Sequence, residues 1–97
     1  MIRRWKFNDK KNTAVFTTVQ VINREMPILY VSHDEDDGAW QFHDGSDVSI
    51  RNAMVVTLSE IISVDITINQ LSELPLGWIA TRDSVNDLWK IEKKFSC

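Results

Sequence analysis

The chain has 97 residues, of which 43% are hydrophobic and 26% charged, and its formal net charge is −3. A chain of this length builds one hydrophobic core, so we expect a single globular domain over residues 1–97. Its tryptophan content excludes a disordered, solvating chain, and the negative net charge argues against electrostatic binding of nucleic acid.

The N-terminal segment and the cysteine content indicate the compartment. Residues 1–11 are charged and lack the apolar core of a signal peptide, and no apolar run approaches the roughly 20 residues that cross a membrane. The one cysteine, Cys97, is the last residue, so it closes no internal disulfide. We therefore expect a cytoplasmic protein that is not embedded in a membrane and folds without oxidation.

Short alternating or apolar runs predict the first elements. RRWKF (residues 3–7) alternates aromatic and basic side chains, which predicts a half-buried strand. AVFTT (residues 14–18) is a second short apolar run. TVQVINRE (residues 18–25) contains valines that favour a strand, but we interpret it as one or two helical turns capped by Thr17 or Thr18.

An acidic turn between two runs of β-forming residues predicts a hairpin. ILYVSH (residues 28–33) and AWQFH (residues 39–43) are separated by DEDDG. Asp37 followed by Gly38 marks a tight turn, because glycine adopts a positive φ without strain. We expect the two runs to pair as antiparallel strands, with the carboxylates of residues 34–37 facing water at the tip.

Helix caps organise the middle of the chain. After a short strand, MVVT, Thr57 and Glu60 match the pattern of a capping box, which predicts a helix over TLSEIISVD. Asp65 then caps ITINQLSEL, whose Ile68 and Leu71 are expected to turn inward, until a proline ends the helix.

The chain closes with GWIATRD (residues 77–83) and LWKIEK (residues 88–93), which are predicted as strands on either side of DSVND. The last run has a helical alternative, because Ser84 can cap it and apolar residues follow near helical spacing. Together the elements predict an α+β fold: an antiparallel or mixed β-sheet of about five to six short strands, with two or three short helices on one face.

Three segments carry a resemblance to a known family. They are ILYVSHDEDDGAWQFHDG, VVTLSEIISVD and LPLGWIATRDSVNDLWK, and the resemblance covers residues 14–90. The chain resembles a group of small bacterial domains of unknown function that has been linked with immunity-type proteins, which protect a cell from a toxin that it or its kin makes. The distinctive marks are the acidic hairpin followed by Trp40, the LPLGW segment and Trp89, whereas residues 46–53 fit least well. The resemblance implies an immunity role, and it brings no catalytic residue set.

The acidic hairpin and its two flanking histidines raise the question of a metal site. If Gly38 is the sixth residue of a calcium loop, His33 takes the first position, where a hard cation needs an oxygen ligand. Zinc requires converging His or Cys ligands, but His33 and His43 are not opposite each other if the Asp-Gly pair is the turn. We therefore expect no metal site and no cofactor.

Catalytic patterns are missing from the sequence. The chain contains no G-x-S-x-G, H-E-x-x-H, P-loop or G-x-G-x-x-G motif. Adjacent carboxylates at a solvated tip share the same environment. Nothing therefore shifts their pKa values apart so that one can act as an acid and another as a base. Ser32 and His33 are neighbours on a strand, so they point to opposite faces and form no dyad. We expect a protein that is not an enzyme.

Acidic and aromatic residues are the candidates for partner binding. The tryptophans on predicted strands either form the packed face of the sheet or include a partly exposed contact anchor beside an arginine. The acidic turn suits a basic partner, although turns also collect aspartates for local reasons. The candidate partner-binding residues are Asp34, Glu35, Asp36, Asp37, Trp40, Trp78, Arg82 and Trp89.

These features favour a non-enzymatic domain that binds and masks a protein partner, toxin-like or other, without nucleic acid or membrane. Two alternatives stay open. One is a small regulatory or housekeeping protein that acts as a homo-oligomer such as a homodimer. The other is a metal-dependent hydrolase, against which the missing motifs argue.

Overall fold

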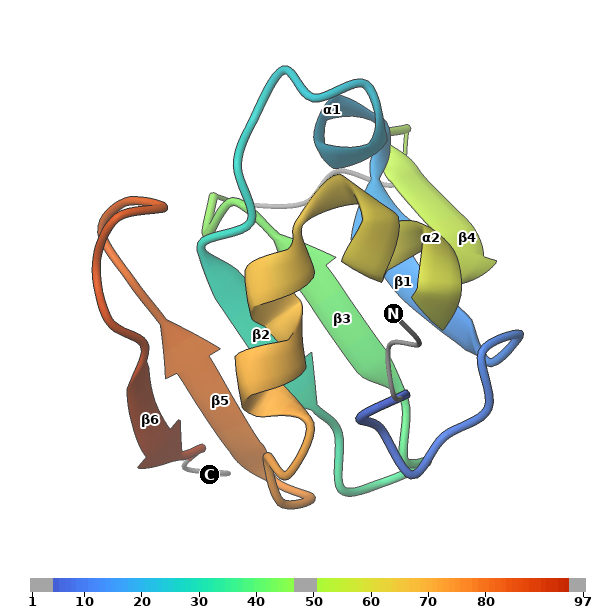
Figure 1. The fold of residues 1–97 in the computed structure, drawn as a ribbon, viewed down its shortest axis with the longest axis vertical. Helices are drawn as coiled ribbons and strands as arrows, with labels where there is room; N and C mark the ends of the chain where they lie inside the picture. Colours follow the sequence, from blue (N-terminus) through green and yellow to red (C-terminus); the bar gives the residue numbers. More distant parts are fainter. Residues whose placement is uncertain (1–4, 47–50, 95–97) are drawn as a thin grey trace.

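The computed structural model describes residues 5–46 and 51–94, and within them the chain forms a six-stranded sheet and three short helices (Figure 1). The predicted α+β fold is therefore confirmed. In chain order the elements are β1 (Ala14–Thr18), α1 (Val19–Ile22), β2 (Tyr30–His33), β3 (Trp40–His43), β4 (Ala53–Thr57), α2 (Leu58–Val64), the 3₁₀ helix η1 (Ile66–Leu71), β5 (Trp78–Thr81) and β6 (Lys90–Lys93).

The sheet is mixed, and its strand order is β4-β1-β3-β2-β5-β6. β1 and β3 are parallel, whereas every other neighbouring pair in this order is antiparallel. The hairpin of β2 and β3 therefore occupies the centre, with β1 and β4 added on one side and β5 and β6 on the other. This order leaves β4 and β6 as the two edges of the sheet.

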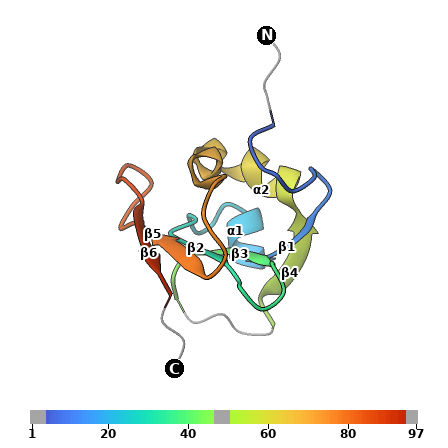
Figure 2. The same ribbon diagram turned by 90° about the horizontal axis from the view of Figure 1, so that it is seen from below.

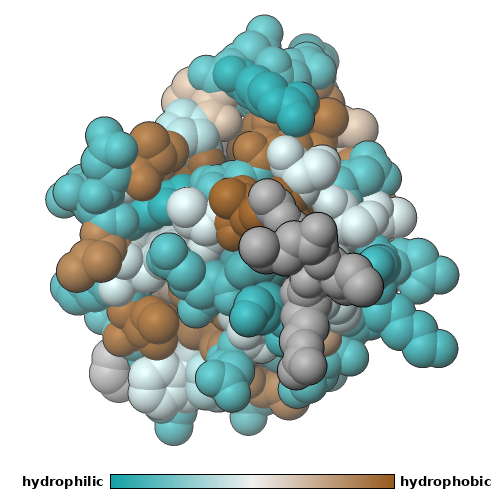
Figure 3. Space-filling model, in the orientation of Figure 1, coloured by the Kyte–Doolittle hydropathy of each residue, from teal (hydrophilic) through white to brown (hydrophobic). Residues whose placement is uncertain are grey.

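The two faces of the sheet differ. α2 and η1 lie against one face, and no helix of the described residues covers the other (Figure 2). Because side chains alternate along a strand, one set points toward the helices. That set packs with the inner sides of the helices to form the core, which includes Val15, Val31, Phe42, Leu58, Ile61, Ile68, Leu71 and Ala80. On the helix-covered side of the molecule, apolar residues at the surface are scattered among hydrophilic ones (Figure 3).

The central hairpin and the last strand follow their predictions. β2 and β3 pair as antiparallel strands, with His33 opposite Trp40 and Tyr30 opposite His43. The last run is a strand, β6, which pairs with β5, so the helical alternative for residues 88–93 is wrong. Pairing with β5 decides this choice, because the run contains signals for both structures.

The predicted helix caps are present. The Thr18 hydroxyl accepts a backbone N–H at 3.2 Å and caps α1. In the capping box of α2, the Thr57 hydroxyl accepts the Glu60 N–H at 3.2 Å, and the Glu60 carboxylate accepts the Thr57 N–H at 3.3 Å. Asp65 caps η1, whose apolar side is buried in the core as predicted. None of the helices in the described ranges is long and apolar enough to cross a membrane.

The strand predicted at the N-terminus is wrong where the structure describes it. Residues 5–7 belong to no strand, and Arg3, Arg4 and Cys97 lie outside the described residues. Phe7 is nevertheless buried and packs edge-on against Trp40, with ring centroids 5.2 Å apart. The apolar alternation therefore reflects burial of aromatic rings against the core rather than pairing with a neighbouring strand.

We expect Thr57→Ala to lower the free energy of unfolding by about 1 kcal/mol, because it removes one half of the capping box. Urea unfolding of the variant and the parent measures this difference. Thr57→Ser keeps the hydroxyl and should unfold within a few tenths of a kcal/mol of the parent. Equal urea midpoints for the alanine variant and the parent would contradict the cap.

Candidate functional site

The strand register places a second set of side chains on the face without helices, which we call the open face. Cross-strand neighbours share a face, so Phe16 of β1 lies beside Val55 of β4 and Gln41 of β3. Phe16 is 44% exposed and Val55 is 60% exposed. His43 and Tyr30 lie on the same face and stack, with ring centroids 4.5 Å apart. The open face therefore presents aromatic and aliphatic surface to solvent.

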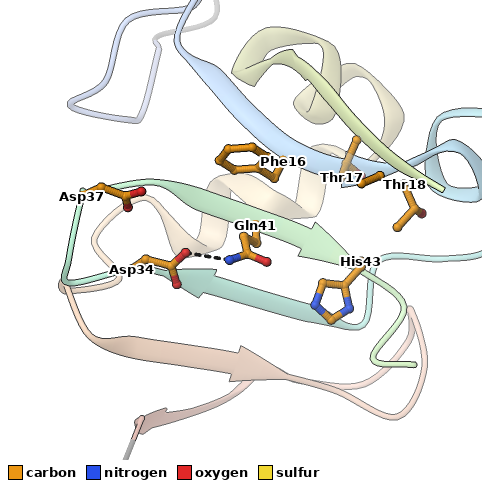
Figure 4. Close-up of a pocket in the computed structure, with 8 residues that line it drawn as sticks. Phe16, Thr17, Thr18, Asp34, Asp37, Gln41 and His43 are labelled. Atoms are coloured by element: carbon orange, nitrogen blue, oxygen red, sulfur yellow. Dashed lines mark hydrogen bonds between the residues drawn. The ribbon is translucent and has the colours of Figure 1, made fainter. Parts of the chain in front are cut away.

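A hollow of about 330 Å³ lies on the open face, and we call it the open-face hollow. Figure 4 shows the carboxylates of Asp34 and Asp37 at one end of it and His43 at the other, with Phe16 and Gln41 between them. Its lining residues are Phe16, Thr17, Thr18, Asp34, Asp37, Gln41, His43 and Ala53. The hollow thus combines an aromatic wall with a negatively charged end.

The charged end belongs to the acidic tip, which is the turn formed by residues 34–37. Its backbone is closed by the Asp34 N–H, which donates to the Ala39 carbonyl at 2.7 Å. The Asp37 carboxylate accepts the Ala39 N–H at 2.9 Å, and the Asp34 carboxylate accepts a hydrogen bond from Gln41 Nε2 at 2.7 Å. Asp34 was predicted to face water, but it is half-buried because this bond draws it over the sheet.

The other two carboxylates of the acidic tip take no part in these turn bonds. Glu35 and Asp36 are exposed, and both line a second hollow of about 320 Å³ together with Lys94. Glu35 also leans over Gly77, where a Cβ atom would lie 3.1 Å from Glu35 Oε2. Gly77 has a φ of 83°, so the close approach and the backbone both favour glycine at this position. The acidic tip therefore contributes to two hollows, since Asp34 and Asp37 line both of them.

His43 is held neutral by its surroundings. Its Nδ1 atom accepts the Gly45 N–H at 3.1 Å, so the proton of the neutral ring lies on Nε2. Burial lowers the pKa of His43 below its ordinary value of 6.5, and the nearby Asp44 carboxylate offsets only part of this effect. The ring therefore contributes no positive charge to the open-face hollow near neutral pH.

His33 lies on the opposite face from His43. Its Nδ1 atom donates to the Leu74 carbonyl at 2.8 Å, because a carbonyl oxygen can only accept, and its ring stacks on Trp40 at 3.9 Å. The two histidines therefore do not converge on one point. In the described part of the chain, no group of three or more His, Cys, Asp or Glu side chains is placed to hold a metal ion.

The three tryptophans among the candidate contact residues are packed to different degrees. Trp40 is 1% exposed, so it belongs to the packed face of the sheet and offers almost no surface to a partner. Trp78 on β5 and Trp89, just before β6, are half-buried against the core. These two rings keep some exposed surface that a partner can contact.

Arg82 has an internal role, although its type suggested a surface contact. Its guanidinium is buried, lies 4.0 Å from the ring centroid of Trp89 and pairs with the Asp65 carboxylate at 2.6 Å. It also donates to the Ile28 carbonyl at 2.9 and 3.1 Å and to the Thr67 hydroxyl at 3.1 Å. Local pattern identifies Asp65 as a cap, but nothing local links it to an arginine 17 positions away.

Sequence reasoning did not identify the open-face residues Phe16 and Val55. The available signal was the alternation within AVFTT and AMVVT, which places every second residue on one face. That signal does not say which face the helices cover, so the exposure of these two side chains appears only in the folded structure.

The chain matched no family model, no curated protein and no solved structure. The resemblance to immunity-linked bacterial domains therefore stays a prediction.

We expect Arg82→Met to lower the free energy of unfolding by about 3 kcal/mol, because it leaves the partly buried Asp65 carboxylate without its partner. Asp65→Asn keeps a cap for η1, so the double variant should lose less than the sum of the two single variants. Urea unfolding of all four proteins measures the coupling. A loss below about 0.5 kcal/mol for Arg82→Met would contradict the assigned role.

We expect the stability of the protein to depend on pH through His43. Because burial lowers its pKa in the folded state, the unfolded chain binds the proton more readily. The contribution of His43 to the free energy of unfolding is therefore fully present above pH 6.5, and it is lost as the pH falls toward the folded-state pKa of His43. Between about pH 7.5 and pH 5, the parent should lose more stability than His43→Gln in urea unfolding. Parallel losses in the two proteins would contradict the prediction.

Proposed function

We propose that this chain is a non-enzymatic protein-binding domain whose contact surface is the open face together with the acidic tip. The observation that carries the proposal is the exposure of Phe16 and Val55 side by side on a face that no described helix covers. Removing such side chains from water releases free energy, so an exposed apolar patch of this kind suits a protein partner.

The acidic tip adds charge to one end of this surface. Asp34 and Asp37 line the open-face hollow, and Glu35 and Asp36 are exposed beside it. Adjacent carboxylates repel one another, so a cationic group of a partner relieves the repulsion and accelerates encounter. His43 at the other end adds no opposing charge near neutral pH. The surface therefore favours a partner that places Lys or Arg next to apolar residues.

The groups in the hollow support binding rather than catalysis. The Thr17 hydroxyl donates to the Phe42 carbonyl at 2.8 Å, and the Thr18 hydroxyl caps α1. His43 uses Nδ1 for a backbone N–H. The hydroxyls and the Nδ1 atom are thus engaged by the fold, and none of these pairs places a base beside a nucleophile.

An immunity-type role is the specific form of this proposal. The resemblance over residues 14–90 implies that the protein masks a toxin. A cytoplasmic location is proposed separately, from the charged N-terminal segment and the lone cysteine. The open face supports this role, because masking needs an extended contact surface and no chemical step. The acidic tip would then meet a basic patch of the toxin.

We expect the full chain, used as bait in a lysate of its native cell, to retain a protein partner. With that partner purified, Phe16→Ser should dissociate about tenfold faster than the parent, because it removes an aromatic anchor. Leu88→Ser is the matched control, since Leu88 is 91% exposed in a loop away from the open face. Equal dissociation rates for Phe16→Ser and the parent would show that the open face is not the contact surface.

The contribution of the acidic tip is measured by association at low and high salt. Glu35→Gln combined with Asp36→Asn should slow association several-fold at low salt and weaken its salt dependence. Glu73→Gln combined with Asp83→Asn changes the net charge equally at exposed positions elsewhere. If both pairs slow association to the same extent, net charge rather than the acidic tip steers the partner.

A further inference from the structure

The two edge strands of the sheet differ in charge: β6 carries charged residues and β4 carries none. β6 (KIEK) presents Lys90, Glu92 and Lys93, and charged side chains on an edge deter pairing with another chain. β4 (AMVVT) contains no charged residue and no proline. An edge of this kind is a template for the addition of a further strand.

The hydrogen-bond pattern identifies which groups of β4 are free. The Val19 N–H donates to the Asn52 carbonyl at 2.8 Å. From this pair onward, hydrogen-bonded and non-hydrogen-bonded residue pairs alternate along β1 and β4. Met54 and Val56 therefore direct their backbone groups toward β1. Ala53 and Val55 direct theirs away from the sheet, and within the described residues no strand lies on that side.

The free part of the edge is short. The Thr57 N–H already donates to Glu60 and its carbonyl opens α2, so the edge ends after Val55. Ala53 and Val55 together offer two N–H and two C=O groups, which a short antiparallel strand can satisfy.

We propose that this edge pairs with the same edge of a second copy, as antiparallel strands related by a two-fold axis at Met54. Ala53 then exchanges backbone hydrogen bonds with Val55 of the second copy, and the reverse pair forms by symmetry. Met54 faces its own counterpart across the axis. The two sheets become one continuous sheet with both open faces on the same side.

Charge complementarity identifies a second copy as the occupant. Arg51 is exposed just before β4, and Glu60 lies beside Thr57 at the other end of the strand. In the proposed register, Arg51 lies in the turn beyond the paired strand and comes to the end of the seam at which the second copy presents Glu60. The two-fold axis repeats this pair at the other end, and no like charges meet along β4 itself.

The pairing also completes the open-face hollow. Ala53 is part of its lining, is exposed, and belongs to the edge strand β4. Val55 of the second copy, which is opposite Ala53, supplies an apolar wall there. Self-association through β4 does not require the proposed partner, so either interaction can be absent while the other is present.

The interface is small, because it rests on one short strand from each copy. Interfaces at the low end of the size range form weak complexes, so the dimer is expected to populate at micromolar concentrations and above. Sedimentation velocity over a range of protein concentrations detects such an equilibrium. The parent should show reversible, concentration-dependent dimers.

The discriminating variant is Val55→Lys, which places a charge on the edge without disturbing buried contacts, since Val55 is 60% exposed. It should weaken self-association at least about tenfold, because the two introduced lysines, one from each copy, lie near each other across the axis and repel. Leu88→Lys adds the same charge to another exposed apolar position and should leave self-association unchanged. A parent that stays monomeric at all concentrations, or a dimer that Val55→Lys does not weaken, overturns the proposal.

The register has its own test. In a Cys97→Ser background, Met54→Cys should form a disulfide-linked dimer on mild oxidation, because residues facing each other in a pair without hydrogen bonds have Cα atoms about 4.5 Å apart. Val85→Cys, at an exposed loop position, is the control and should not cross-link. Cross-linking at residue 85 but not at residue 54 overturns the two-fold pairing. Protection of the β4 amides from hydrogen exchange only when a different protein is added overturns it as well.

Discussion

The ion pair between buried Arg82 and partly buried Asp65 ties the helix layer to the sheet at a polar point beside the hydrophobic core. Arg82 follows β5, and Asp65 caps η1, so one contact at 2.6 Å joins the two layers. The same guanidinium donates to the Ile28 carbonyl ahead of β2 and stacks on Trp89 ahead of β6. A buried cation needs these partners, because an unpaired charge in the interior is costly. The Arg82 side chain therefore links η1 and the segments ahead of β2 and β6 to the end of β5, in addition to the hydrophobic core.

One consequence of this layering is that the helices of the described residues cover only one side of the sheet. With α2 and η1 fixed on one face, the alternation of β1 and β4 leaves Phe16 and Val55 on the other. The open face and the hollow on it result from this arrangement. A fold that covered both faces would have buried the surface on which the proposed binding depends.

The acidic tip is a structural feature as well as a charged one. Asp37 and Asp34 hold the turn and the start of β3 through bonds to Ala39 and Gln41, whereas Glu35 and Asp36 project into solvent. Two of the carboxylates thus hold the turn through hydrogen bonds, and two do not. The exposed pair is the part of the tip for which partner binding offers an explanation.

Local signals in the sequence determined the elements themselves. The hairpin, the Thr18 cap, the Thr57–Glu60 box and the Asp65 cap depend on hydrogen bonds between residues a few positions apart, so their chemistry is readable in the chain order. Only the tertiary structure decided that β1 and β3 pair in parallel and that residues 90–93 form a strand. It also decided the burial of residues 5–7 outside any strand and the partner of Arg82. The physical reason is that these features depend on which faces and edges meet, and no pattern within a single segment records the segment against which it will pack.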